Sequence, residues 1–101
     1  MNKLFVLVRA DLAPSYQAVQ AGHAVAAWIL DKAPGSWENE ILVYLHVRRE
    51  QDLLDLADRL TWEGRAWVLF REPDLGGQAT ALAVLGGDKL LARYPLLELG
   101  A

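Results

Sequence analysis

A run of small and apolar residues in the first third of the chain restricts most strongly what it can fold into. Residues 18–30 are apolar at almost every position, with Gln20 and His23 as the exceptions. A helix that is apolar nearly all round is buried on more than one side. We therefore expect one side of this helix to pack on a sheet and another to meet a second copy of the chain, which makes the protein a homodimer.

Gln20 and His23 are the strongest indication of function in the sequence. They are three residues apart and share a helix face with Tyr16, which lies one turn before them. An amide and an imidazole are costly to bury unless partners are present. Their position predicts either a functional site or internal hydrogen bonds. The internal partners would be backbone groups of the turns around Asp11 or Asp74 for Gln20, and a loop carbonyl for His23.

Length and composition exclude several classes of protein. With 101 residues and 53% hydrophobic content, residues 1–101 are expected to form one globular domain. The longest apolar run, residues 24–30, is too short to span a bilayer, and no secretory signal precedes it. We therefore expect no membrane association and a cytoplasmic location.

The absence of cysteine excludes disulfides and a cysteine nucleophile. Two histidines without metal-ligand spacing predict no metal site, and nothing indicates a cofactor.

The net charge of −3 argues against non-specific binding of nucleic acid, which requires clustered lysine and arginine side chains. The basic residues are scattered along the sequence, apart from the pair Arg48-Arg49. This mild acidic balance does not exclude a local positive groove.

Apolar runs separated by turn residues predict the element order β-α-β-α-β-β-α. Strands are expected at residues 4–8, 41–47, 66–70 and 79–85, with a return to the sheet edge at 96–99. Helices are expected at residues 15–32, at 50–63, and from Gly86-Gly87-Asp88 to Tyr94, with a turn at 72–77. Right-handed crossovers between the early strands and a hairpin between the third and fourth then give an α/β fold with a mixed sheet.

Three sequence features together resemble the type-2 peptidyl-tRNA hydrolase family. Residues 8–12 (Val-Arg-Ala-Asp-Leu) resemble its Arg-x-Asp-Leu motif, and residues 18–24 (Ala-Val-Gln-Ala-Gly-His-Ala) resemble its Ala-Ala-Gln-x-x-His-Ala motif. Asp74 lies close to where the family has its catalytic aspartate. The similarity extends from Leu4 to about Leu99 in element order and length. It implies a mixed four-stranded sheet with helices on both faces, and a dimer.

The chain departs from the family pattern at two places. Ser15 and Tyr16 occupy the positions of a glycine-lysine pair whose lysine is counted among the family's functional residues. Residues 75–79 (Leu-Gly-Gly-Gln-Ala) replace a loop resembling Ala-Gly-Arg-Thr-Gln, so that its arginine and threonine are missing. Thr80 is either a displaced substitute for that threonine or an ordinary strand residue.

The resemblance implies an esterase that takes peptidyl-tRNA and cleaves the bond between the peptidyl carbonyl and the 3′ ribose. In this hypothesis Asp74 orients or deprotonates the attacking water, and His23 donates a proton to the leaving oxygen. Gln20 completes the catalytic set, and the oxyanion is steadied by Gln20, Thr80 or a loop N–H. In the ordinary interpretation, Asp74 is simply a turn aspartate that follows a proline.

Five further side chains are predicted to contact the substrate: Arg9, Asp11, Tyr16, Gln78 and Thr80. Arg9 either binds an anion or forms an ion pair with Asp11 or Asp74. Asp11 is also a candidate cap for the following helix, and Tyr16 either contacts the substrate or packs at the start of that helix. Trp37 stands alone in a polar loop and is predicted to line a surface pocket.

Two other functions remain open. The missing lysine and the acidic balance favour a non-catalytic, dimeric member of the fold that binds a small ligand or a protein partner. Hydrolysis of another ester or amide in the same site is equally compatible with these residues.

Overall fold

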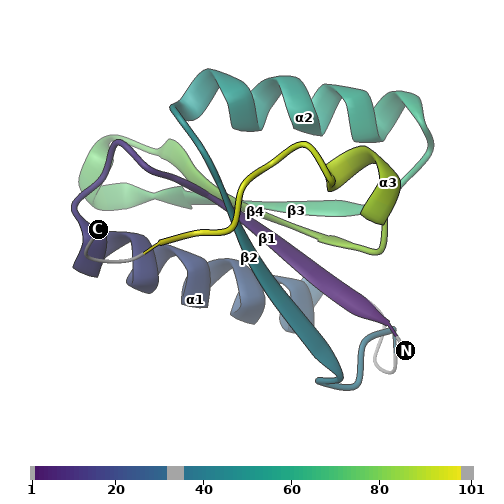
Figure 1. Ribbon diagram of the computed structural model, residues 1–101. Helices are drawn as coiled ribbons and strands as arrows, with labels where there is room; N and C mark the ends of the chain where they lie inside the picture. Colours follow the sequence, from purple (N-terminus) through teal and green to yellow (C-terminus); the bar gives the residue numbers. More distant parts are fainter. Residues whose placement is uncertain (1, 32–35, 99–101) are drawn as a thin grey trace.

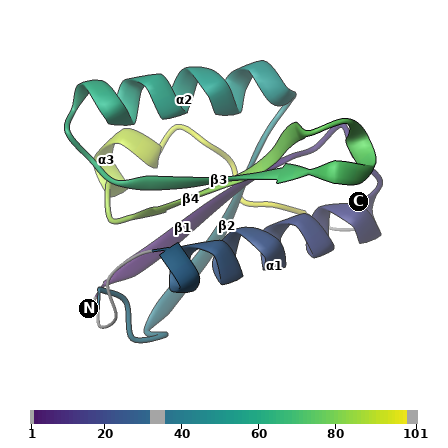
Figure 2. The ribbon, with the colours of Figure 1, turned by 180° about the vertical axis from the view of Figure 1, so that it is seen from behind.

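Four strands form a mixed sheet at the centre of the computed structural model, which describes residues 2–31 and 36–98. The strands are β1 (Lys3–Arg9), β2 (Ile41–Val47), β3 (Trp67–Glu72) and β4 (Gln78–Leu85). The helices are α1 (Pro14–Asp31), α2 (Glu50–Trp62) and the short α3 (Asp88–Leu91), and a single 3-10 turn, η1 (Pro73–Leu75), follows β3. Helix α1 covers one face of the sheet, and α2 and α3 cover the other (Figure 1, Figure 2). The predicted α/β class with a mixed four-stranded sheet is confirmed.

The strand order β2-β1-β4-β3 places three parallel strands around one antiparallel strand. β1 pairs parallel with β2 and antiparallel with β4, and β4 pairs antiparallel with β3. β1, β2 and β3 therefore run in the same direction, and their carboxyl ends meet at one edge of the sheet. The predicted hairpin between the third and fourth strands is present.

The hydrophobic core has one layer on each face of the sheet, because successive side chains of a strand point to opposite faces. Leu4, Val6 and Val8 of β1 pack in the layer that contains Ala21, Ala24 and Trp28 of α1. The intervening apolar residues of β1 pack with the buried leucines of α2 in the other layer: Phe5, Leu7, Leu53, Leu56 and Leu60. β1 is thus covered on both sides, as its continuous apolar sequence predicts.

A β-bulge in the β3–β4 hairpin changes which side chains of β4 face α1. Phe70 is opposite Ala81, but the next residue of β3, Arg71, is opposite Ala79, so that Thr80 is the extra residue. Ala79 packs in the α2 layer and Ala81 in the α1 layer. Thr80 hydrogen-bonds to α1 as well. The bulge therefore turns two consecutive side chains, Thr80 and Ala81, toward α1.

Several predicted boundaries are wrong by a few residues. β3 continues to Glu72, which the sequence placed in a turn, because the hairpin ladder extends to the pair Glu72–Gln78. The last helix is a single turn ending at Leu91 instead of Tyr94. Trp37, predicted to line a surface pocket, is buried, and its Nε1 donates to the carbonyl of Ile41 at 3.1 Å. Lys32 and Leu99, the predicted limits of two segments, lie outside the described residues.

The segment after α3 covers part of the outer edge of β2. The N–H of His46 donates to the carbonyl of Pro95 at 3.0 Å, and the N–H of Leu97 donates to the carbonyl of Tyr44 at 2.9 Å. Leu96 forms an antiparallel bridge with Leu45. The predicted return of the chain to the sheet edge is therefore present over these described residues.

Within residues 2–31 and 36–98, no helix combines the length and the apolar character that crossing a bilayer requires.

The exposed side of α1 carries large apolar side chains, at which the predicted homodimer can be tested. Val19, Ile29 and Leu30 are all exposed, and Leu30 is 83% accessible. If this surface joins two copies of the chain, replacing Ile29 or Leu30 by glutamate will shift the protein to monomers in sedimentation velocity, because a charge will be buried without a partner. Leu96→Glu, at an exposed leucine away from α1, should leave the oligomeric state unchanged. A wild-type protein that sediments only as a monomer at micromolar concentration would contradict the dimer.

Candidate functional site

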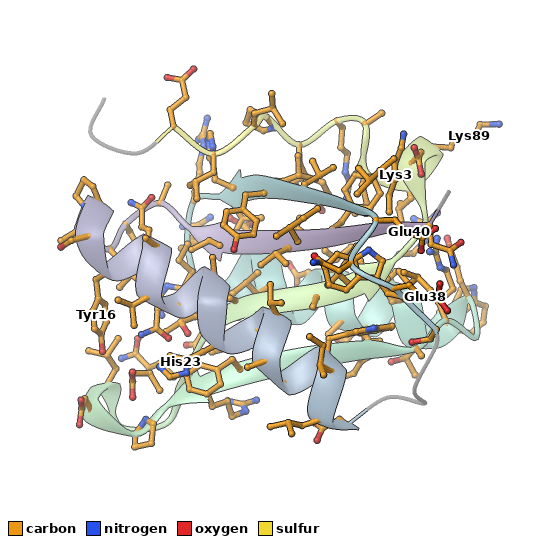
Figure 3. All side chains as sticks on the ribbon, turned by 90° about the horizontal axis from the view of Figure 1, so that it is seen from below. Lys3, Tyr16, His23, Glu38, Glu40 and Lys89 are labelled. Carbon is orange, nitrogen blue, oxygen red and sulfur yellow. The ribbon has the colours of Figure 1, made fainter. Side chains whose placement is uncertain are left out.

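The candidate site lies at the edge where the carboxyl ends of β1, β2 and β3 meet. The loop after β1 leads to α1 on one face, whereas the loop after β2 leads to α2 on the other. In open α/β sheets, ligands bind at such an edge, where successive connections go to opposite faces. The start of α1 and the β3–β4 hairpin lie side by side here (Figure 1, Figure 2). Tyr16 and His23 project from α1 toward the hairpin (Figure 3).

Gln20 lies at the centre of a buried hydrogen-bond network between α1 and the hairpin. Its side chain is 0% exposed. Its Nε2 donates to Oε1 of Glu72 at 3.0 Å, and its Oε1 accepts from the hydroxyl of Thr80 at 2.5 Å. The predicted bonds of Gln20 to turn backbone are therefore wrong. Gln17, one turn earlier, makes such bonds instead, because its Nε2 donates to the carbonyls of Ala10 and Leu12 at 3.2 and 2.6 Å.

Glu72 is a nearly buried carboxylate, 8% exposed, that accepts two hydrogen bonds from the described residues. The Gln20 amide donates at 3.0 Å and the backbone N–H of Asp74 at 3.2 Å. The hydrogen bond from Gln20 is the largest cause that lowers the pKa of Glu72, and the proximity of His23 acts in the same direction. The pKa of Tyr16 is raised, first by desolvation and then by the neighbouring Glu72 carboxylate. Glu72 is therefore held ionised and Tyr16 protonated.

His23 presents an exposed imidazole beside this network. Its ring stacks on that of Phe70, with centroids 4.4 Å apart and planes 7° from parallel. Phe70 lies two residues before Glu72 on β3, so both side chains face α1. The flat contact fixes the orientation of the imidazole while the residue stays accessible to solvent. The histidine that bonds a carbonyl is His46, whose Nδ1 lies 3.1 Å from the Leu96 oxygen.

Asp74 lies in η1 with an exposed side chain. Its N–H donates to Glu72, and its negative charge contributes to the raised pKa of Tyr16. No described residue donates a hydrogen bond to the carboxylate of Asp74. The structure thus brings Asp74, Tyr16, Glu72 and His23 to the same side of the sheet, where Asp74 is the carboxylate that solvent reaches.

Arg9, Asp11 and Gln78 form a separate cluster. Arg9 Nε and Nη2 donate to both carboxylate oxygens of Asp11, at 3.0 and 2.9 Å. Its Nη1 donates to Oε1 of Gln78 at 2.9 Å and to the carbonyl of Ala79 at 3.1 Å. Arg9 continues the alternation of Phe5 and Leu7, so that it lies on the α2 side of the sheet. The predicted substrate-binding residues are thus divided between the two faces, and Arg9 pairs with Asp11 and not with Asp74.

Sequence reasoning missed Glu72 and Phe70, which the structure places under Gln20 and His23. The alternation of side chains between the two faces along β3 is the sequence pattern that could have identified them. A strand that continues beyond Phe70 puts residues 70 and 72 on one face, but the sequence Glu-Pro-Asp at 72–74 indicated that the strand had already ended. Among the described residues, no group of three or more histidine or acidic side chains is arranged to hold a metal ion.

Comparisons with known proteins support the fold. No protein-family model matches the chain, and no curated protein matches it either. A solved structure of a protein of unknown function from Agrobacterium tumefaciens strain C58, Atu0240, is similar, with a TM-score of 0.73 and 12% sequence identity. The similarity covers 96% of this chain and 98% of that one. It shows a common fold.

The buried network makes Gln20 important for stability. Gln20→Leu keeps a side chain of similar size but leaves the Glu72 carboxylate and the Thr80 hydroxyl without this partner. We expect the free energy of unfolding in urea to fall by about 1–3 kcal/mol. Gln51→Leu is the matched control, because Gln51 is exposed on α2 and bonds only Asp55 among the described residues. Gln51→Leu should change the free energy of unfolding by less than about 0.5 kcal/mol. Equal effects of the two substitutions would contradict the network.

The lowered pKa of Glu72 predicts a dependence of stability on pH. Its ionised form stabilises the fold above the ordinary pKa of 4.5, and this contribution is lost as the pH falls through the lower pKa of the folded state. Urea unfolding at successive pH values below neutral should therefore show a shallower acid-side decline for Glu72→Gln than for the wild type. Asp88→Asn removes a carboxylate whose pKa is lowered by the exposed ion pair with Lys3, and it should change this slope less. An unchanged slope in Glu72→Gln would refute the assignment.

Proposed function

We propose that the protein is a hydrolase of the peptidyl-tRNA hydrolase type, which cleaves the ester bond between a peptidyl carbonyl and the 3′ ribose of tRNA. One observation carries the proposal. An exposed imidazole, oriented by stacking on Phe70, lies beside a carboxylate that a fully buried glutamine holds in place. The resemblance of residues 8–12 and 18–24 to the family motifs supports the same assignment.

The exposed side chains divide the reaction between them. Asp74 takes a proton from water, whose oxygen forms a bond to the peptidyl carbonyl carbon. The bond from this carbon to the ribose oxygen breaks, and His23 in its protonated form supplies the proton to that oxygen. Asp74 is better suited to the role of base than Glu72, because its side chain is exposed, whereas Glu72 is nearly buried and already accepts hydrogen bonds from Gln20 and from the N–H of Asp74.

Gln20 and Thr80 have a different role from the one that the sequence suggested. Both are fully buried, and they bond each other. In this structure, Gln20 and Thr80 therefore cannot contact the oxyanion or the substrate. We assign Gln20 as a positioning residue that fixes Glu72 relative to His23, and Thr80 as the residue that orients the Gln20 amide.

A second candidate function is a non-catalytic domain of the same fold that binds a ligand or a protein. The observation that favours it is the position of Tyr16, where the family has its functional lysine. Tyr16 lies close to Glu72, whose carboxylate accepts hydrogen bonds from Gln20 and from the N–H of Asp74, so the carboxylate is satisfied inside the protein. In this alternative the network is purely structural.

Hydrolysis of N-acylated aminoacyl-tRNA distinguishes the two functions. We expect the wild type to release the acyl group, and His23→Ala and Asp74→Ala to be slower by about a hundredfold or more, because each removes a group that transfers a proton. His46→Ala and Asp58→Ala are the matched controls: His46 lies on β2, and Asp58 is exposed on α2. The controls should retain the wild-type rate. No turnover by the wild type, or equal rates in all variants, would reject the hydrolase in favour of the binding domain.

A further inference from the structure

Two adjoining grooves run along α2 and α3. These helices lie on the opposite face of the sheet from α1 (Figure 1). The grooves have volumes of about 410 and 490 Å³, and Arg59 and Arg93 line both of them. Arg48 also lines the first groove, and Arg65 and Lys89 also line the second. The fold thus gathers five cationic side chains that are scattered along the sequence.

These grooves have the opposite charge balance from the chain as a whole. Five cationic side chains and three carboxylates line the grooves. The whole chain, in contrast, has 10 lysine and arginine residues and 13 aspartate and glutamate residues. The three carboxylates already accept hydrogen bonds from the protein: Asp52 from backbone N–H groups, Asp55 from Gln51 and Glu63 from Arg59. The grooves are therefore a local positive surface on an acidic protein.

Most of these cations are free to bind an external anion. Arg59 forms an ion pair with Glu63 at 2.7 Å. Arg48, Arg65, Lys89 and Arg93 form no ion pair with any carboxylate of the described residues. An unpaired guanidinium binds phosphate strongly, because its planar N–H groups match two phosphate oxygens.

Two of the guanidinium groups are held in place by the protein. Arg65 Nη2 donates to the carbonyl of Leu85 at 2.7 Å, and the guanidinium lies so close to Gly87 that a Cβ there would clash with it. The guanidinium of Arg93 lies 5.1 Å above the centroid of the Tyr94 ring, and its Nη2 lies 3.1 Å from the Tyr94 hydroxyl. Such pre-oriented groups lose little conformational entropy when they bind a ligand.

The grooves suit an extended ligand that carries regularly spaced phosphates. The first groove reaches Val47 and Arg48, at the carboxyl edge of the sheet where Glu72 and Asp74 also lie. Near the second groove, one helical turn after Arg59, Trp62 is 87% exposed. Cations that follow a backbone, combined with an exposed aromatic ring for stacking, are typical of surfaces that bind single-stranded nucleic acid.

We infer that the α2–α3 grooves bind the phosphodiester backbone of single-stranded RNA and lead it toward the carboxyl edge of the sheet. The positive surface follows from the geometry alone. The choice of RNA over another polyanion rests on the proposed function, because peptidyl-tRNA presents a single-stranded 3′ end. Binding and hydrolysis are measured separately, so the failure of one is distinguishable from the failure of the other.

The test is fluorescence anisotropy with a short, labelled, unacylated single-stranded RNA at several salt concentrations. We expect salt-dependent binding by the wild type. Arg48→Ala and Arg93→Ala should each weaken binding about tenfold at low salt, as the loss of one charged hydrogen-bonding contact predicts. Each should also reduce the slope of log affinity against log salt by about 0.7. Circular dichroism verifies that the variants are folded.

Arg71→Ala is the matched control. Arg71 is exposed on β3, has no ion pair with a described carboxylate, and does not line either groove. It should bind RNA within about twofold of the wild type, since a contact outside the site adds little to affinity. The inference is overturned if the wild type does not bind RNA, or if Arg71→Ala loses as much affinity as Arg93→Ala. It is also overturned if oligoglutamate of equal charge displaces the RNA as well as unlabelled RNA does.

Discussion

The hydrogen bonds of Gln20 are the constraint on which the arrangement of the candidate site depends. A fully buried amide requires both a donor and an acceptor as partners, since leaving either end unpaired costs about 1–3 kcal/mol. Glu72 at the end of β3 and Thr80 in the bulge of β4 supply them. The bonds therefore hold α1 in one position over the hairpin. His23 and Tyr16, which lie on the same helix, take their places from that position.

The bulge at Thr80 is the local feature that makes this arrangement possible. In a regular strand, Thr80 would alternate with its neighbours and point away from α1 if Ala81 points toward it. The extra residue lets both face the helix, so that an apolar contact and a hydrogen bond are made side by side. A polar pair can thus be built into the core layer of α1 without interrupting its packing.

Most of the fold could be predicted from the sequence, because each element has a clear local pattern. The apolar runs and the turn residues between them indicated the type and the order of the strands and helices. The site was only partly predictable. Gln20 and His23 were identified as unusual residues in an apolar helix, but their partners Glu72 and Phe70 depend on how far β3 extends. That length is decided by pairing with β4, which is a tertiary interaction that a local pattern does not contain.

The distribution of charge over the surface likewise depends on tertiary structure and not on local sequence. Arg48, Arg65 and Arg93 are far apart in the sequence, and a net charge of −3 hides the side of the molecule on which they gather. Their convergence follows from the packing of α2 and α3 on one face of the sheet. For a small α/β protein, overall charge is therefore a poor guide to the electrostatics of an individual surface.

The short segment at Pro95–Leu97 has a consequence for how copies of this protein can associate. An exposed edge strand is a template on which another chain can extend the sheet, and such growth has no natural end point. By bonding to Tyr44 and His46, the segment occupies part of the free edge of β2. At this edge of the sheet it therefore blocks the backbone groups that an added strand would need, whereas β3 forms the opposite edge.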